Sequence, residues 1–338
     1  MFFINKYYPK TTNDIFFHKK EFETLKEISN DDEVPHIIFY GLEGCGKRTT
    51  INLFLEMLYG PDVHTLNETV YNVFSSGNTQ TEVIINQSNY HIVIEPYNNN
   101  FDRYLIQDVV KDYAKKIPLN VFTTKKTFKT VLINNVDKLS YYAQTSLRRT
   151  MEKYSNICRF IMWSNSLSKV IEPLRSRCFC FKLTVPTDSE LFSILVNICG
   201  KELISLSLAE YDEIIQRSGG NVKKLLWLLE IKKHGDSMES IYDIKINEII
   251  QCVFLNKIET LLSIRELAYH MMITNIDGTM IMKDILDKLL AYEKLSMIQK
   301  TNIVEACAAY EHNLIRGRRE IIHLEVFMIN VMKIIHKY

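Results

Sequence analysis

The chain has 338 residues, of which 46% are apolar and 24% are charged. This composition is typical of a globular protein and excludes a collagen-like, mucin-like or disordered chain. Lys and Arg number 41 against 40 Asp and Glu, so the formal net charge is +1. Such a balance excludes DNA or membrane affinity through bulk charge, so any nucleic-acid contact needs a local patch or several copies of the chain.

The seven cysteines are scattered along the chain, without a C-x-x-C pair or a zinc-finger spacing to histidine. Their odd number and dispersal favour reduced thiols in an intracellular protein, and we expect no metal site. The start of the chain lacks the pattern of a signal peptide. No apolar run reaches the ~18 residues that a membrane span needs, so we expect a soluble protein.

Short apolar runs alternate with helical periods over the first half of the chain. The helical period at Ile51, Phe54, Leu55 and Leu58 follows the i, i+3, i+4, i+7 spacing of one helix face. This rhythm predicts an α/β domain, with a parallel sheet covered by helices on both faces. The predicted strands are residues 36–40, 90–94, 130–133, 159–163 and 178–183.

After Pro186 strand patterns become scarce and helical periods dominate, so an all-α region is expected to follow the α/β domain. The polar stretch 232–237 is the best linker candidate, and polar loops are expected at 75–81 and 123–127. We therefore predict three domains, over residues 1–186, 187–236 and 237–338. One face of the last helix is predicted at Ile321, Leu324, Met328, Val331 and Ile335.

The segment Gly41–Lys47 reads G-x-x-G-x-G-K, follows a predicted strand and precedes a predicted helix. This is the context of a phosphate-binding P-loop, in which backbone N–H groups and the helix N-terminus hold the phosphates. A glycine-rich turn without a ligand is the alternative, and the agreement of motif and context argues against it. The expected nucleotide contacts are Gly41, Gly44, Cys45, Gly46, Lys47, Arg48 and Thr49.

The groups that hold a metal ion and activate water are altered around this loop. Arg48 stands where a Ser or Thr hydroxyl normally binds Mg²⁺, and guanidinium cannot be a ligand. Thr49 lies about 100° further round the helix. Asn134 and Asn135 occupy the two positions of the metal-binding and water-activating carboxylates. The sequence therefore predicts ATP or ADP binding without hydrolysis, and makes Mg²⁺ coordination doubtful.

Several further motifs occur in order and at compatible spacing. They are Lys6–Pro9, Val34–Gly41, Leu147–Tyr154, Asn165, Leu174–Cys178 and Gly220–Leu226. Together they resemble the small subunits of replication factor C, the clamp loader of DNA replication in the AAA+ superfamily. The likeness covers nearly the whole chain and is strongest to the small subunit whose own ATPase site is degenerate. Tyr8 and Lys223 depart from the family, which has arginine at both positions.

This resemblance implies an AAA+ P-loop domain, a small helical lid and a C-terminal helical collar that joins the subunits of a hetero-pentamer. It adds Tyr7, Pro9, Asn165 and Lys223 to the expected nucleotide contacts. It also makes Arg177, in the S-R-C motif, an arginine finger that acts in trans on the ATP of the neighbouring subunit. The implied partners are the other subunits, a PCNA-type clamp and primer–template DNA, and the implied location is the nucleus, or a viral replication compartment.

Two surfaces are candidates for contacts with DNA and with the clamp. Basic and polar side chains recur every four residues and would share one helix face; they are Arg103, Gln107, Lys111 and Lys115. A solvated helix face is an equally good interpretation of this stripe. Tyr141 and Tyr142 begin the helix that faces the clamp in the family, although core packing of one of them is an alternative.

The resulting hypothesis is a non-hydrolysing clamp-loader subunit. The alternatives are a self-sufficient AAA+ DNA-dependent ATPase, a subunit of an alternative loader for checkpoint or cohesion functions, and a purely structural relative. Asn134, Asn135 and Arg48 argue against the ATPase, and the intact loop Gly41–Lys47 argues against the purely structural relative. Nothing in the sequence separates the two kinds of loader.

Overall fold

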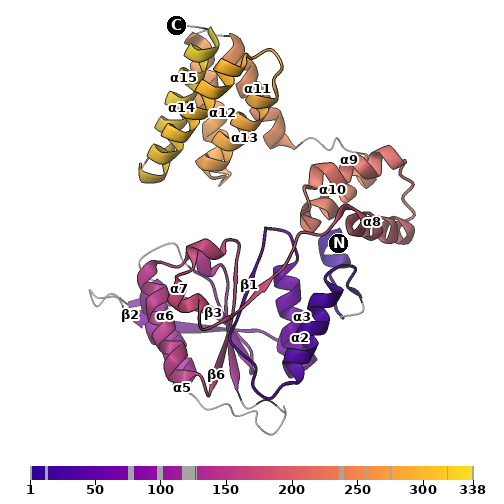
Figure 1. Cartoon of the computed structure of the whole chain (residues 1–338), viewed down its shortest axis with the longest axis vertical. Helices are drawn as coiled ribbons and strands as arrows, with labels where there is room; N and C mark the ends of the chain where they lie inside the picture. The colour runs from indigo at the N-terminus through magenta and orange to yellow at the C-terminus, as the bar shows by residue number, and fades with distance from the viewer. Residues whose placement is uncertain are drawn as a thin grey trace. The chain divides into compact units, whose positions relative to one another are not determined.

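A computed structural model describes residues 2–11, 14–74, 80–96, 102–115, 126, 128–235, 240–255, 258–274, 276–317 and 319–336 (Figure 1). The chain divides into two compact units, Met1–Asp236 and Ser237–Tyr338. The first contains the sheet and the phosphate loop, and the second is helical. In the described part of the chain, no helix is both long and apolar enough to cross a membrane.

The first unit is built on a seven-stranded sheet with the order β2-β3-β4-β5-β6-β1-β7. The five strands from β4 to β7 in this order are parallel. They are β1 (Ile37–Tyr40), β4 (His91–Ile94), β5 (Lys129–Ile133), β6 (Cys158–Ser164) and β7 (Phe179–Lys182). These are the five strands predicted from the sequence, with each end within about one residue of its predicted place.

A hairpin that was not predicted from the sequence lies at the edge of this sheet. β2 (Asn67–Phe74) and β3 (Gln80–Gln87) pair antiparallel, and β3 pairs antiparallel with β4. The predicted loop 75–81 was therefore wrong at its end, since Thr81 lies in β3, and residues 75–79 lie outside the described part. The hairpin escaped because its outer face carries polar residues around an exposed cross-strand pair, Val70 and Ile84, which hides the strand alternation.

Alternate residues of the central strands point to opposite faces of the sheet, and both faces are covered by helices. Ile37 and Phe39 pack in one apolar cluster and Ile38 in the other. Figure 1 shows α2 (Lys19–Asn30) and α3 (Lys47–Tyr59) on one side of the sheet, and α5 (Lys111–Lys115) and α6 (Tyr141–Tyr154) on the other. This double cover explains why the central strands are continuous apolar runs that the sequence reveals.

A buried glutamine of α6 fixes the loops that follow β5 and β6. Gln144 is 2% exposed, and its Nε2 donates to the carbonyls of Leu139 (3.1 Å) and Lys169 (3.2 Å). Its Oε1 accepts from the backbone N–H of Ile171 at 2.9 Å. These bonds hold the ends of two central strands, where the candidate site lies, at a fixed distance from α6.

The lid helices complete the first unit. They are α8 (Asp188–Glu202), α9 (Leu208–Ser218) and α10 (Val222–His234). Thr187 and Ser207 begin α8 and α9 with reciprocal capping boxes, and Asn221 caps α10. The predicted linker was wrong at its start, because residues 232–234 form the last turn of α10 and Gly235 ends that helix. The expected boundary between residues 186 and 187 stays a prediction.

The second unit has its own apolar core. Its helices are α11 (Ile241–Leu255), α12 (Ile258–Ile273), α13 (Gly278–Ala291), α14 (Met297–Arg316) and α15 (Glu320–His336). The predicted apolar face of α15 is confirmed, since Ile321, Leu324, Met328 and Val331 are buried and Ile335 packs partly buried against them. This unit buries one face of each helix in its own core and leaves other large apolar side chains exposed, among them Leu262, Ile273 and Ile298.

Candidate functional site

The glycine-rich loop joins β1 to α3, as the sequence predicted. Gly44 and Gly46 have φ angles of 80° and 87°, which L side chains rarely adopt. A Cβ on Gly41 would lie 2.2 Å from the carbonyl oxygen of Leu183, and one on Gly44 would lie 2.1 Å from the Asn221 side chain. Close approach therefore requires glycine at position 41, backbone conformation requires it at position 46, and both require it at position 44.

Lys47 opens α3 and is 6% exposed. Its ammonium donates to the carbonyls of Gly41 (2.8 Å) and Leu42 (2.7 Å), so it closes the loop on itself. Burial lowers the pKa of this ammonium, while Cys45, Glu43 and Asp137 act in the opposite direction. The cation lies at the mouth of a helix N-terminus, an arrangement that suits an anionic ligand.

Segments distant in the sequence hold the loop from two sides. His18 Nε2 hydrogen-bonds the carbonyl of Cys45 at 3.1 Å, and the Phe17 ring lies beside Gly46. On the other side, the first N–H of lid helix α10, from Val222, donates to the carbonyl of Gly44 at 3.2 Å. The shape of the loop therefore depends on both the N-terminal segment and the lid.

Asn134, at the end of β5, is a buried bridge between the neighbouring strands. Its Nδ2 donates to Glu95 Oε1 at 2.8 Å, and its Oδ1 accepts from Trp163 Nε1 at 2.7 Å. Glu95 directly follows β4 and Trp163 lies in β6. The sequence identified the amide but missed both of its partners, because only the strand order brings them together.

Arg48 lines a cavity of about 110 Å³ together with Glu95, Asn134 and Trp163. Asn135 has a left-handed backbone with φ of 46°, so the chain turns away directly after β5. At the positions that hold Mg²⁺ in a P-loop ATPase, this chain thus offers a permanent cation and an amide with both heteroatoms engaged. These residues do not fit a magnesium ion.

Asp137, beyond the strand end, has one carboxylate oxygen that is buried and has no hydrogen-bond partner in the described part of the chain. Nowhere in that part do three or more His, Cys, Asp or Glu side chains gather as a metal site.

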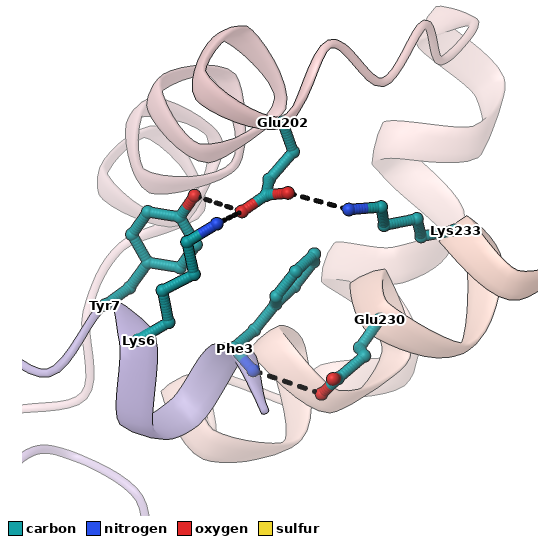
Figure 2. Close-up of polar contacts among 6 residues, drawn as sticks. All are labelled: Phe3, Lys6, Tyr7, Glu202, Glu230 and Lys233. Atoms are coloured by element: carbon teal, nitrogen blue, oxygen red, sulfur yellow. Dashed lines mark hydrogen bonds and ion pairs between the residues drawn. The ribbon is translucent and has the colours of Figure 1, made fainter. Parts of the chain in front are cut away.

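The N-terminal segment ties the lid to the phosphate-loop helix (Figure 2). Glu202, 8% exposed at the end of α8, accepts from Tyr7, from Lys6 (2.5 Å) and from Lys233 (2.7 Å). The next residue, Tyr8, accepts from Asn52 of α3 at 2.9 Å. The segment therefore spans from α8 and α10 to α3.

A buried aromatic side chain supports this attachment. Phe3, in the short helix α1 (Phe3–Lys6), is 4% exposed, and its N–H donates to Glu230 of α10 at 3.2 Å. The Phe3 and Tyr7 rings meet edge to face at 5.7 Å. No sequence signal singled out Glu202 or Glu230, because both act through contacts with residues about 200 positions away.

The remaining predicted nucleotide contacts are dispersed around the loop. The Tyr7 hydroxyl is bound to Glu202, and Pro9 is half-buried two residues further on. Asn165 is exposed directly after β6, and Lys223 is exposed in the first turn of α10. Nucleotide contact by these residues stays a prediction.

Arg177 lies two residues after α7 (Glu172–Arg175), with its side chain 39% exposed. Its Nη1 donates to the Pro173 carbonyl at 2.7 Å, and its Nη2 pairs with Glu152 Oε1 of α6 at 2.7 Å. The guanidinium is thus oriented at the surface and still accessible, as an arginine that reaches another subunit must be.

Most residues of the two candidate surfaces are exposed, and the alternative that one of the tyrosines packs in the core is wrong. Tyr141 and Tyr142 are each 68% exposed, so neither packs in the core. Arg103, Lys111 and Lys115 are exposed, whereas Gln107 is half-buried. The stripe runs along α4 (Asp102–Leu105), the π-helical turn η3 (Ile106–Val110) and α5, whose opposite face is buried. Its function in DNA binding stays a prediction.

Residues 244–338 match a family model described as the C-terminal domain of replication factor C subunit 3. Residues 17–187 match one described as DNA polymerase III, delta subunit. The chain is 37% identical to a mimivirus protein named as a replication factor C small subunit, over 98% of this chain and 91% of that protein. It is 31% identical to mouse replication factor C subunit 3, over 99% of this chain and 96% of that protein.

The chain belongs to the replication factor C small-subunit family. The clamp-loader resemblance inferred from the motifs is thereby confirmed, as is the predicted α/β plus all-α fold class. A gamma subunit-related protein of DNA polymerase III from Thermotoga maritima shares the fold, with a TM-score of 0.50 and 13% identity. That likeness covers 92% of this chain and 98% of the bacterial one.

In this replication factor C subunit, we expect Glu202→Gln to loosen the lid and lower the melting temperature by a few degrees. The bonds from Lys233, Lys6 and Tyr7 lower the pKa of Glu202 from 4.5 to about 2. A lowered carboxyl pKa stabilises the fold above pH 4.5, and this stabilisation is lost as the pH falls toward 2. Thermal unfolding of both proteins at several pH values measures the effect.

The difference between wild type and Glu202→Gln should be constant above about pH 5 and shrink below it. Glu213→Gln is a matched control on the lid, because Glu213 is 41% exposed and pairs with the exposed Arg217 at 2.9 Å. An equal loss of melting temperature in both variants would contradict a special function of Glu202.

Proposed function

We propose that the chain is a subunit of a pentameric DNA sliding-clamp loader that places a PCNA-type clamp at primer–template junctions. In this proposal its own site binds ATP or ADP and does not hydrolyse it. The observation that carries the second part is the amide of Asn134, which is bonded on one side to Glu95 and on the other to Trp163. Family membership over the full chain supports the first part.

Hydrolysis at a P-loop needs a carboxylate that holds the metal ion and a group that orients or activates water. Asn134 and Asn135 supply neither a negative charge nor a base at the end of β5. Nucleotide binding depends on other parts, namely the backbone of Gly41–Gly46 and the ammonium of Lys47, and these are retained. Binding and hydrolysis are therefore separable in this subunit.

We further propose that Arg177 acts on the ATP of the neighbouring subunit. An arginine brought to a transferring phosphoryl group stabilises its charge, an effect worth ~10³-fold or more in rate. The ion pair with Glu152 and the bond to the Pro173 carbonyl support this proposal, because they orient the guanidinium while it stays accessible. To act in trans, the guanidinium of Arg177 would release the Glu152 carboxylate and bind a phosphate group of the neighbouring subunit's ATP instead.

Arg177→Ala should lower ATP turnover of the reconstituted loader, measured with clamp and primed DNA, by at least about tenfold per affected site. The isolated chain should show no turnover. Arg217→Ala is the matched control, since Arg217 is also 39% exposed and paired with a surface glutamate, and it should leave turnover unchanged.

Unchanged turnover in the Arg177→Ala loader would refute the action in trans. Measurable turnover by the purified chain would instead favour the alternative of a self-sufficient AAA+ ATPase. Co-purification with the large subunit of a checkpoint or cohesion loader would extend the proposal to those complexes.

The exposed pair Tyr141 and Tyr142 is proposed to contact the clamp. Exposed aromatic side chains at the start of a helix are typical binding hot spots. Y141A/Y142A should weaken clamp binding by the assembled loader roughly tenfold or more, measured by equilibrium titration. Tyr269→Ala, at a residue 47% exposed on α12, serves as the control, and an equal effect of both changes would contradict the assignment.

The stripe on α4 and α5 is proposed to follow the DNA backbone. Loss of phosphate contacts reduces the salt dependence of binding by about 0.9 per contact. R103A/K111A in the assembled loader should therefore make the slope of log K against log salt shallower by up to about 2. K19A/K20A removes two exposed charges from α2 as a control. An unchanged slope in R103A/K111A would show that the stripe is a solvated helix face.

A further inference from the structure

We infer that this site holds its nucleotide without a divalent metal ion, with Arg48 supplying positive charge that a metal supplies in other P-loops. The inference rests on the nucleotide binding proposed above and adds how the site satisfies phosphate charge. A P-loop ordinarily implies a bound Mg²⁺, but the residues at the ends of β4, β5 and β6 do not offer the ligands that this ion needs.

Both ends of the Asn134 side-chain amide are already hydrogen-bonded. An amide can ligate a metal through its oxygen, but Oδ1 already accepts from Trp163 Nε1 at 2.7 Å. Its Nδ2 donates to Glu95 at 2.8 Å, so the donor hydrogens face the neighbouring strand end. At 6% exposure the side chain has little access to other partners. With one lone pair of Oδ1 taken by Trp163, a metal ion here could gain at most one neutral ligand, which lacks the charge of a carboxylate.

Arg48 brings a permanent positive charge to the cavity. Arg48 follows Lys47 directly and lines the same cavity as Asn134 and Trp163. A divalent cation would therefore meet permanent positive charge where its hydroxyl ligand normally stands. Arginine can itself donate to phosphate oxygens, and it keeps its charge at every physiological pH. The residue that excludes the metal can thus replace part of its electrostatic effect.

Glu95 lies directly beside Asn134 at the end of the neighbouring strand. The carboxylate that β5 lacks lies one strand away, on Glu95, bonded to the amide that takes its place. A carboxylate at position 134 would meet the Glu95 oxygen across this 2.8 Å contact, and the two would repel. The amide and the carboxylate are therefore a matched pair, and a carboxylate at position 134 would disrupt it.

The test is the affinity of the purified full-length chain for ADP, measured by calorimetry with Mg²⁺ and again with EDTA. We expect the two dissociation constants to agree within about threefold. Arg48→Thr, which restores a hydroxyl, should weaken binding in EDTA about tenfold or more. Arg217→Ala removes an exposed arginine elsewhere and should leave both constants unchanged.

A designed exchange makes the test sharper. E95Q/N134D swaps carboxylate and amide, keeps the net charge, and preserves a donor for each acceptor in the bridge. The triple variant R48T/E95Q/N134D adds the hydroxyl and should bind ADP about tenfold or more tightly in Mg²⁺ than in EDTA. In the double variant, which keeps Arg48, Mg²⁺ should raise the affinity for ADP by a smaller factor.

Fluorescence gives a second readout within the site. Trp163 lies 5.5 Å from the Lys47 ammonium, and Trp227 on the lid can be removed by W227F. We expect ADP to change Trp163 emission in EDTA as much as in Mg²⁺.

Wild-type binding that requires Mg²⁺ would overturn the inference and leave the proposed nucleotide binding intact. Absence of ADP binding under both conditions would overturn the nucleotide-binding part of the proposed function, and the inference with it. The wild-type comparison decides between these outcomes even if a variant fails to fold.

Discussion

The bridge from Glu95 through Asn134 to Trp163 is the constraint on which the chemistry of the phosphate site depends. A buried polar side chain must be satisfied, and leaving one unpaired costs about 1–3 kcal/mol. The amide of Asn134 donates to a carboxylate on one side and accepts from an indole on the other, which an ionised carboxylate at that position could not do. Satisfying this bridge ties three strand ends together and places a neutral amide where a P-loop ATPase has a carboxylate.

Helix α6, which covers one face of the sheet, also connects the tyrosine pair with Arg177. α6 has 14 residues, with Tyr141 and Tyr142 in its first turn and Glu152 in its last. Glu152 holds Arg177, and Gln144 between them fixes the loops after β5 and β6. One helix therefore carries the tyrosine pair at its start, the side chain that fixes the strand-end loops in its middle, and the ion-pair partner of Arg177 near its end.

Local pattern explains what could be predicted from the sequence. The central strands are apolar on both faces, and the P-loop joins a strand to a helix, so both are visible in short windows. The hairpin was missed because Val70 and Ile84 pack against each other in solvent among polar neighbours. Glu95, Glu202 and Asn221 were missed because their significance arises from contacts that the fold creates between distant segments.

The pairing of Asn134 with Glu95 also constrains the order in which substitutions can be accepted at these two positions. Asn134→Asp by itself places two carboxylates across a 2.8 Å contact inside the protein, an unfavourable single step. A carboxylate at position 134 therefore becomes acceptable only if Glu95 is altered first or at the same time. The order of the two substitutions, rather than their number, decides whether the carboxylate can be introduced.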